Sequence, residues 1–152
     1  MTANVGRIRV EPGGANVVPG LSDFTIDVRS ASLAGLAKLE DLVEETVATV
    51  AAEEGLTAEL ESTFALEPLQ LDPALVAVLE RAAATEGATV RRMPSGAGHD
   101  AMVIGRHVPA AMLFVPSHGG VSHSPEEDSR PEHVELGMHV LASALKETLG
   151  GE

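Results

Sequence analysis

The sequence contains no cysteine and few aromatic residues, with three phenylalanines and neither tryptophan nor tyrosine. The absence of cysteine excludes a disulfide scaffold, a thiolate metal site and a thiol nucleophile. Because 44% of the residues are hydrophobic, a core is still expected, built from Ala, Val, Leu and Ile. The 152 residues are enough for one ordinary domain or for two small half-domains.

Basic residues are also scarce, since 10 Lys and Arg stand against 23 Asp and Glu, for a formal net charge of −13. A protein of that sign repels phosphate backbones, so nucleic acid is not an expected partner. No apolar run approaches the roughly 18 residues of a membrane span. The first ten residues lack the basic start and apolar centre of a secretory signal. We therefore expect a soluble, cytoplasmic protein without a membrane partner.

The first half of the chain predicts part of an α+β layer. Apolar and polar residues alternate over residues 4–12 and 21–30, and a loop rich in Pro and Gly separates the two runs. A helix is predicted from Ser32, which caps it, to Gly55, and a third strand over 56–66. Strand, strand, helix and strand form half of such a layer.

The second half predicts an α/β pattern. Its helices are expected over residues 72–87, over 98–104 and from 129 onward, and its strands over 88–93 and 109–117. Ser129 and Glu132 form a capping box for the last helix. The inward stripe of that helix is predicted to be Val134, Met138, Leu141, Leu145 and Leu149. The chain opens directly on a strand, and both halves look as though they continue upstream of Met1.

All the histidines lie in the second half, and one of them has a setting suited to metal binding. His123 lies in the loop "GGVSHSPEE", after an expected buried strand, and Pro125 restricts the backbone two residues on. An imidazole there can ligate a metal or transfer a proton. Glu126 or Glu127 could hydrogen-bond its other nitrogen. A solvent-exposed loop histidine is the plain alternative.

Three other residues are candidates for ligand binding. His99 follows the glycines of "SGAGHDAM", which let a ligand approach the backbone, although they also suit a turn and a helix cap. Asn16 lies at the crown of the Pro/Gly loop, where Asn is common for conformational reasons. Arg29 ends a strand on its outer face and offers a fork of donors for a carboxylate, or is a solvated charge. The remaining histidines are predicted to be structural: His107, His118, His133 and His139.

The sequence lacks the motifs of a complete hydrolase site. It contains no H-x-D or H-E-x-x-H cluster for a metal and no G-x-S-x-G elbow for a serine nucleophile. A catalytic zinc needs about three protein ligands. One candidate histidine cannot hold such an ion.

Three stretches, in this order, resemble hydantoinase/carbamoylase-type amidohydrolases: "VGRIRVEPGGANVVPG…FTIDVRS", "PSGAGHDAM" and "MLFVPSHGGVSHSPEE". That group is a branch of the M20 metallopeptidase clan and includes N-carbamoyl-L-amino-acid hydrolases, allantoate amidohydrolases and β-ureidopropionases. The resemblance covers nearly all of this chain but only the C-terminal portion of the family's longer chain. It implies an α/β fold that also contains an α+β part. Residues 1–67 would be the second part of an α+β dimerisation (lid) domain, and 68–152 the C-terminal part of an M20-type α/β zinc-hydrolase catalytic domain.

Carried over residue by residue, the resemblance makes His123 a metal ligand, with Glu127 as the acidic residue of the same motif. It implies two divalent ions, zinc or manganese, whose bridging hydroxide attacks the carbamoyl or amide carbon. The family's H-x-D ligand, bridging aspartate, adjacent glutamates and lid-domain histidine have no counterpart here, and its general base belongs to the absent N-terminal part. We therefore expect that this chain alone holds no two-metal site and turns over no substrate.

The resemblance also implies which residues of this chain bind the substrate. Asn16 and Arg29 would be the lid-domain pair that holds the substrate's carboxylate, while Gly98 and His99 would line the substrate pocket. In the complete protein the lid domain implies a homodimer, and lid closure would align the bond to be cut. An unpaired edge strand and exposed apolar faces predict oligomers or poor solubility for the isolated chain.

Three functional hypotheses remain open. The first is the C-terminal portion of an amidohydrolase that cleaves the carbamoyl or amide C–N bond of N-carbamoyl amino acids or of a ureido acid such as allantoate. The second is a non-catalytic module for dimerisation or for binding small carboxylates. The third is an M20 peptidase or aminoacylase relative with a different scissile bond.

Overall fold

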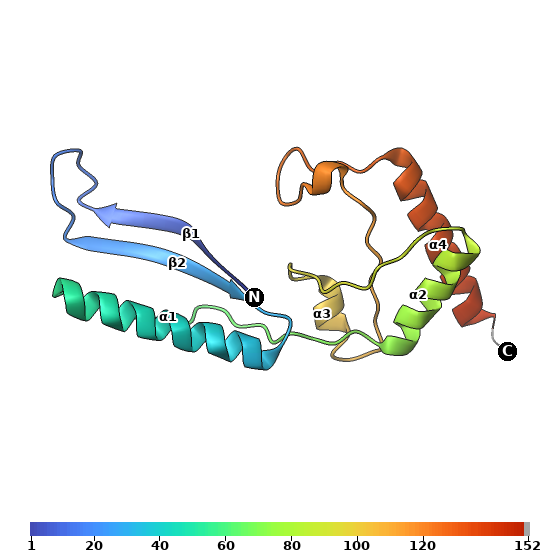
Figure 1. The fold of residues 1–152 in the computed structure, drawn as a ribbon, viewed down its shortest axis with the longest axis horizontal. Helices are drawn as coiled ribbons and strands as arrows, with labels where there is room; N and C mark the ends of the chain where they lie inside the picture. Colours follow the sequence, from blue (N-terminus) through green and yellow to red (C-terminus); the bar gives the residue numbers. More distant parts are fainter. Residues whose placement is uncertain (151–152) are drawn as a thin grey trace. The chain divides into compact units, whose positions relative to one another are not determined.

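The computed structural model describes residues 1–150, and the chain divides into two compact units (Figure 1). The first unit comprises Met1–Pro68 together with Pro94–Ala97, and the second comprises Leu69–Met93 together with the residues from Gly98 onward. A small sheet and several helices make the chain a mixed α/β protein, which confirms the predicted class. Within residues 1–150, no helix is long and apolar enough to cross a bilayer.

The first unit is built on an antiparallel hairpin of β1 (Thr2–Glu11) and β2 (Leu21–Arg29). The strands pair from end to end except at Gly6, where the register shifts between Val5 and Arg7, and Arg29 lies opposite Thr2 at one end. The loop of residues 12–20 closes the other end, where the backbone N–H of Gly20 donates to the carbonyl of Glu11 at 2.8 Å. The alternation of apolar and polar residues predicted both strands.

Helix α1 (Leu33–Glu54) follows the hairpin and contacts β2. Its start is as predicted, because the Ser32 hydroxyl accepts a hydrogen bond from the Gly35 N–H at 3.1 Å. Its end is also as predicted, since Gly55 adopts a left-handed φ of 67° that is unfavourable for other residues. Four of the apolar residues at helical spacing are half-buried, namely Leu36, Leu39, Val43 and Val47, whereas Val50 is 48% exposed.

The prediction of a third strand in the first unit, over 56–66, is wrong. These residues have no regular secondary structure, and Leu56, Leu60 and Phe64 are exposed. Alternating residues can favour a strand, but a strand forms only where a neighbour completes its backbone hydrogen bonds. The same reason applies to the strands predicted over 88–93 and 109–117, which are likewise irregular.

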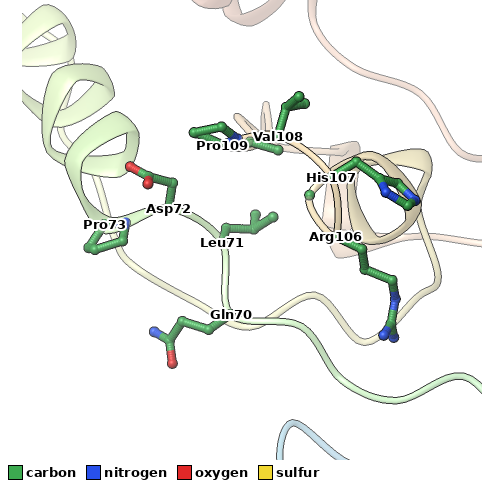
Figure 2. Close-up of a pocket in the computed structure, with 10 residues that line it drawn as sticks. Gln70, Leu71, Asp72, Pro73, Arg106, His107, Val108 and Pro109 are labelled. Carbon is green, nitrogen blue, oxygen red and sulfur yellow. The ribbon is translucent and has the colours of Figure 1, made fainter.

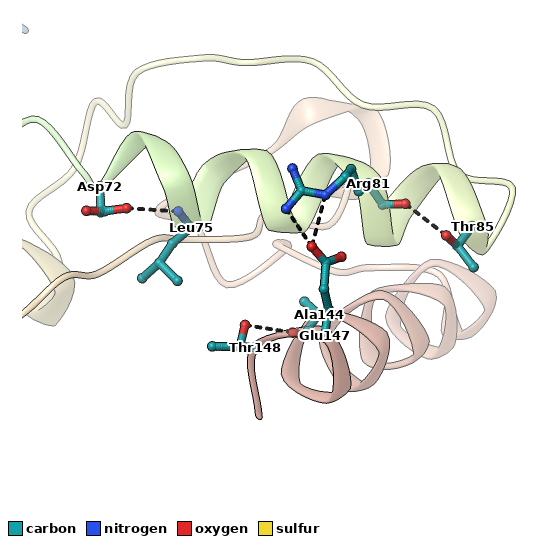
Figure 3. A network of polar contacts seen from close by, with 7 residues as sticks. All are labelled: Asp72, Leu75, Arg81, Thr85, Ala144, Glu147 and Thr148. Atoms are coloured by element: carbon teal, nitrogen blue, oxygen red, sulfur yellow. Dashed lines mark hydrogen bonds and ion pairs between the residues drawn. The ribbon is translucent and has the colours of Figure 1, made fainter. Parts of the chain in front are cut away.

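The second unit is organised by two helices, α2 (Pro73–Thr85) and α4 (Pro131–Leu149), which pack against each other. Its buried core consists of small or medium side chains, which let the helices approach closely: Ala82, Ala83, Val140 and Ala144. The predicted cap of α2 is confirmed, because Asp72 Oδ1 accepts from the Leu75 N–H at 2.9 Å (Figure 3). Figure 3 also shows Arg81 of α2 reaching Glu147 of α4, with Nε 2.9 Å from Oε1.

The start of α4 differs from the prediction. The helix begins at Pro131 with Arg130 as its N-cap, and no side chain caps it, so the capping box of Ser129 and Glu132 is wrong. Proline is favoured at the first helical position because it has no N–H to satisfy and its φ suits a helix. The short helix predicted over 98–104 is present as α3 (Asp100–Ile104).

The predicted inward stripe of α4 is also wrong, because the packing uses another face of the helix. Val140 and Ala144 are buried, whereas Met138 is 64% exposed and the rest of the stripe is exposed as well. Leu141 and Leu145 instead line an apolar groove of about 330 Å³ in the second unit. Its other lining residues are Leu75, Val78, Leu79, Ala111, Leu113, Ala144 and Thr148.

The helix pair makes a testable prediction. Ala83 is fully buried between α2 and α4, so Ala83→Leu has no space for the larger side chain and should lower the free energy of unfolding by about 1–3 kcal/mol. Ala84→Leu, at an exposed position of the same helix, should change it by less than about 0.5 kcal/mol. Denaturant unfolding followed by circular dichroism measures both, and equal effects of the two substitutions would contradict this packing.

Candidate functional site

Arg29, at the end of β2, is held by hydrogen bonds from three different nitrogens. Its Nε donates to Asp27 Oδ1 at 2.8 Å and its Nη2 to Asp27 Oδ2 at 2.6 Å. Its Nη1 donates to the carbonyl of Gly96 at 2.9 Å. Asp27 and Arg29 share one face of the strand because side chains alternate along β2. The guanidinium is therefore oriented, although 44% of the side chain is exposed.

The pairing changes the acid–base properties of both groups. The hydrogen bond from Arg29 lowers the pKa of the Asp27 carboxyl, and the hydrogen bond to Asp27 raises the pKa of the Arg29 guanidinium. Both groups are therefore charged at neutral pH. A charged guanidinium in a fixed orientation suits the recognition of a carboxylate.

The segment that supplies the third partner of Arg29 is itself ordered. Pro94–Ala97 belongs to the first unit, although the residues on either side of it belong to the second. The Ser95 hydroxyl donates to the carbonyl of Ala97 at 2.8 Å and accepts from its N–H at 3.2 Å. This local turn fixes the carbonyl of Gly96 relative to its own neighbours.

The hairpin register separates Asn16 from Arg29. Asn16 lies in the loop of residues 12–20, and Arg29 lies at the opposite end of β2. At 3.3–3.4 Å per residue, the strand from Leu21 to Arg29 spans about 27 Å. A single small carboxylate therefore cannot contact both residues of one chain.

His99 and Gly98 lie at the start of α3 in the second unit. His99 is the N-cap residue, but its side chain makes no capping hydrogen bond. Its ring packs edge-to-face against Phe114, with ring centroids 5.6 Å apart and an angle of 63° between the planes. A Cβ added at Gly98 would meet no atom within 4 Å, so the backbone there is open to a ligand.

His123 lies in a loop of the second unit that is closed at its base. The backbone N–H of His118 donates to the carbonyl of Asp128 at 2.6 Å, and Gly119 and Gly120 take left-handed conformations within the loop. His123 itself has a φ of 57°. This conformation costs a non-glycine residue about 1–2 kcal/mol, and such strain is frequent at functional sites.

Glu127 supports this strained position, but not as the sequence predicted. Its Oε2 accepts a hydrogen bond from the backbone N–H of His123 at 2.9 Å. The sequence suggested that Glu126 or Glu127 accepts a hydrogen bond from the imidazole, whereas Glu126 donates its backbone N–H to the Ser124 hydroxyl. Glu127 thus holds the backbone of His123 and leaves the exposed imidazole available for another partner.

A complete metal site is not present within residues 1–150. They contain no group of three or more His, Cys, Asp or Glu side chains that could hold a metal ion. His133, which was predicted to be structural, has a buried Nδ1 without a hydrogen-bond partner. Within that part of the chain, the side chains therefore do not form the three-ligand site that a catalytic zinc needs.

The structure adds two features that sequence reasoning missed. Asp27 and the Gly96 carbonyl orient Arg29; the "DVR" spacing could have indicated Asp27, whereas nothing in the sequence indicated Gly96. A cleft of about 380 Å³ in the second unit lies between residues 70–73 and 105–110 (Figure 2). A hydrogen bond joins its walls, from the Asp72 N–H to the Ala110 carbonyl at 2.9 Å. The cleft contains none of the predicted site residues.

Comparison with curated proteins gives relatives that are named as amidohydrolases. The chain is 39% identical over 140 residues to the allantoate amidohydrolase of Bacillus subtilis, covering 92% of this chain and 34% of that protein. It is 40% identical over 144 residues to the N-carbamoyl-L-amino-acid amidohydrolase of Paenarthrobacter aurescens, covering 95% of this chain and 35% of that protein. The chain thus spans about a third of the length of these relatives.

The solved structures agree. A hydantoinase/carbamoylase family amidase from Burkholderia vietnamiensis is 40% identical, with a TM-score of 0.89 over 96% of this chain and 35% of that chain. The model of the peptidase family M20/M25/M40 matches residues 2–147. Because this match covers nearly the whole chain, and because the relatives agree with the resemblance carried by the motifs around Arg29, His99 and His123, the chain belongs to peptidase family M20/M25/M40.

Proposed function

We propose that this chain forms part of an amidohydrolase that cleaves the carbamoyl or amide C–N bond of an N-carbamoyl amino acid or of a ureido acid such as allantoate. The observation that carries the proposal is the identity of 39–40%, over more than nine-tenths of the chain, with an allantoate amidohydrolase and an N-carbamoyl-L-amino-acid amidohydrolase. The substrates in both names carry a carboxylate. The oriented guanidinium of Arg29 suits that group.

The remainder of the site would come from residues outside this chain. The relatives are about three times as long, and residues 1–150 offer no three-ligand metal cluster. The apolar groove beside α2 and α4 and the exposed stripe of α4 support the same view, because soluble domains seldom leave such surfaces uncovered. In this proposal His123 supplies one ligand to a divalent metal, zinc or manganese, and Glu127 holds the backbone of that ligand.

The two compact units correspond to two roles in the proposal. Residues 1–67 would belong to a dimerisation (lid) domain and residues 68–152 to the catalytic domain. The division of the chain between Pro68 and Leu69 supports this boundary. Gly98 and His99, at the open start of α3, would line the substrate pocket.

A homodimer would resolve the separation of Asn16 from Arg29. About 27 Å of strand lies between them in one chain. If both hold the same carboxylate, Arg29 must come from one copy and Asn16 from another. Dimerisation through the lid domain would then be a condition for substrate binding.

A non-catalytic module that binds small carboxylates is a second candidate. It is favoured by one observation, namely that the oriented arginine lies in this chain whereas a complete set of metal ligands does not. The two candidates differ in whether His123 matters, because only the enzyme needs its imidazole.

A chimera tests the enzyme and the role of His123. Residues 2–147 would replace the matching segment of the Paenarthrobacter aurescens relative, and release of ammonia from an N-carbamoyl-L-amino acid would be measured. We expect turnover by the chimera and none by the 152-residue chain alone. His123→Ala should lower kcat by more than about 100-fold and should also lower the metal content. Substituting a residue that only hydrogen-bonds a metal ligand already lowers metal affinity or activity by about 10–100-fold, so loss of the ligand itself should have a larger effect.

His139→Ala is the matched control, since His139 is an exposed histidine on α4 of the same unit. It should leave turnover and metal content unchanged. A folded chimera without activity, or full activity and metal content in His123→Ala, would contradict the proposal.

Mixing two inactive variants tests the homodimer. Asn16→Ala and Arg29→Ala chimeras should each lose activity, because the substrate's carboxylate loses a partner. When the two are mixed and exchange subunits, half of the dimers are mixed, and each mixed dimer has one intact site. We therefore expect roughly a quarter of the unsubstituted activity to return. No recovery after verified exchange would mean that the two residues do not act across copies.

A further inference from the structure

Asp27 is not among the residues assigned to substrate binding above, yet both of its carboxylate oxygens accept hydrogen bonds from Arg29. The contacts are 2.8 Å to Nε and 2.6 Å to Nη2. Two bonds along one edge of a planar guanidinium prevent its rotation, and the bond from Nη1 to the Gly96 carbonyl holds it from another direction. An arginine at the end of a strand, 44% exposed, would otherwise take several orientations.

The geometry leaves a defined set of donors for a ligand. A guanidinium has five N–H donors. Arg29 uses three of them within residues 1–150, one on Nε, one on Nη1 and one on Nη2. One N–H therefore remains on each terminal nitrogen. Two donors on neighbouring nitrogens match the two oxygens of a carboxylate.

We propose that Asp27 is a positioning residue that orients Arg29, so that its two remaining N–H donors receive the carboxylate of a small ureido or carbamoyl acid. This inference rests on the proposed role of Arg29 in substrate binding. Asp27 does not touch the substrate. It acts through the guanidinium, whose ordering it completes before the ligand arrives.

The direction in which substitution of Asp27 changes the affinity for the ligand separates this role from that of an ordinary surface ion pair. Asp27 carries the same charge as the ligand, so removing that charge favours binding of an anion if electrostatic repulsion is all that changes. If Asp27 positions Arg29, its removal weakens binding instead. The two explanations therefore predict opposite changes in affinity.

The experiment titrates the full chain with N-carbamoylglycine and measures affinity from backbone amide shifts in ¹H–¹⁵N NMR spectra, which every variant gives. The Nε–H signal of Arg29 is followed in the same spectra wherever Arg29 is present. Asp27→Asn keeps the shape of the side chain but loses the charge. We expect it to weaken binding by about 2- to 10-fold, the cost of ordering one long side chain, and to move the Nε–H signal toward that of a free arginine. Asp27→Glu, which keeps the carboxylate, should retain more affinity than Asp27→Asn.

Asp23→Asn is the matched control. Asp23 also lies on β2, is similarly exposed and pairs with Arg7 at 3.2 Å, but it makes no contact with Arg29. Its substitution should leave affinity and the Arg29 signal unchanged. The uncharged amide N-carbamoylglycinamide should not shift that signal.

The outcomes separate the two proposals. Unchanged or tighter binding by Asp27→Asn, with binding lost in Arg29→Ala, would overturn the role of Asp27 and leave that of Arg29 intact. Equal binding by Arg29→Ala would overturn both, as would the absence of any Arg29 shift up to the solubility limit of the acid. If Asp23→Asn weakened binding as much as Asp27→Asn does, the role of Asp27 would also be overturned.

Discussion

The pairing of β1 with β2 determines where Arg29, Asp27 and Asn16 lie within the first unit. Antiparallel hydrogen bonds pair the two strands, with a register shift between Val5 and Arg7, so Arg29 stands at one end of the hairpin and the Asn16 loop at the other. Alternation along β2 then puts Asp27 on the same face as Arg29, which makes their ion pair possible. Both the orientation of the guanidinium and the separation of Asn16 from Arg29 follow from this pairing.

Backbone hydrogen bonding also explains which elements are present. The helices α1, α2 and α4 satisfy their backbone groups within themselves, so they form wherever their sequence permits. The apolar segment over 109–117 would need a neighbouring strand, and within residues 1–150 it has none. In the same way, the apolar side chains that line the groove beside α2 and α4 have no neighbouring segment that covers them within residues 1–150. These surfaces are consistent with a chain that spans about a third of its relatives.

The site could be predicted from the sequence only in part. The motif around His123 identified a loop histidine, and the structure adds the strained backbone and the Glu127 bond to its N–H. The sequence predicts Glu126 or Glu127 at the imidazole because a carboxylate commonly accepts a hydrogen bond from the ring of a metal-binding histidine. The sequence does not show that His123 is left-handed and that its backbone N–H takes this carboxylate instead. The partnership of Arg29 with Gly96 lay beyond prediction because the two are far apart in the chain.

The sequence by itself determined the local elements and the family. Caps at Ser32 and Asp72, the glycine after α1 and the alternation of β2 are short-range effects, and each acts within a few residues. Only the tertiary structure decided which face of α4 is buried, which extended segments become strands, and that Asn16 and Arg29 of one chain stand apart. Those outcomes depend on partners distant in sequence, because burial and strand pairing are properties of two surfaces and a local pattern describes only one of them.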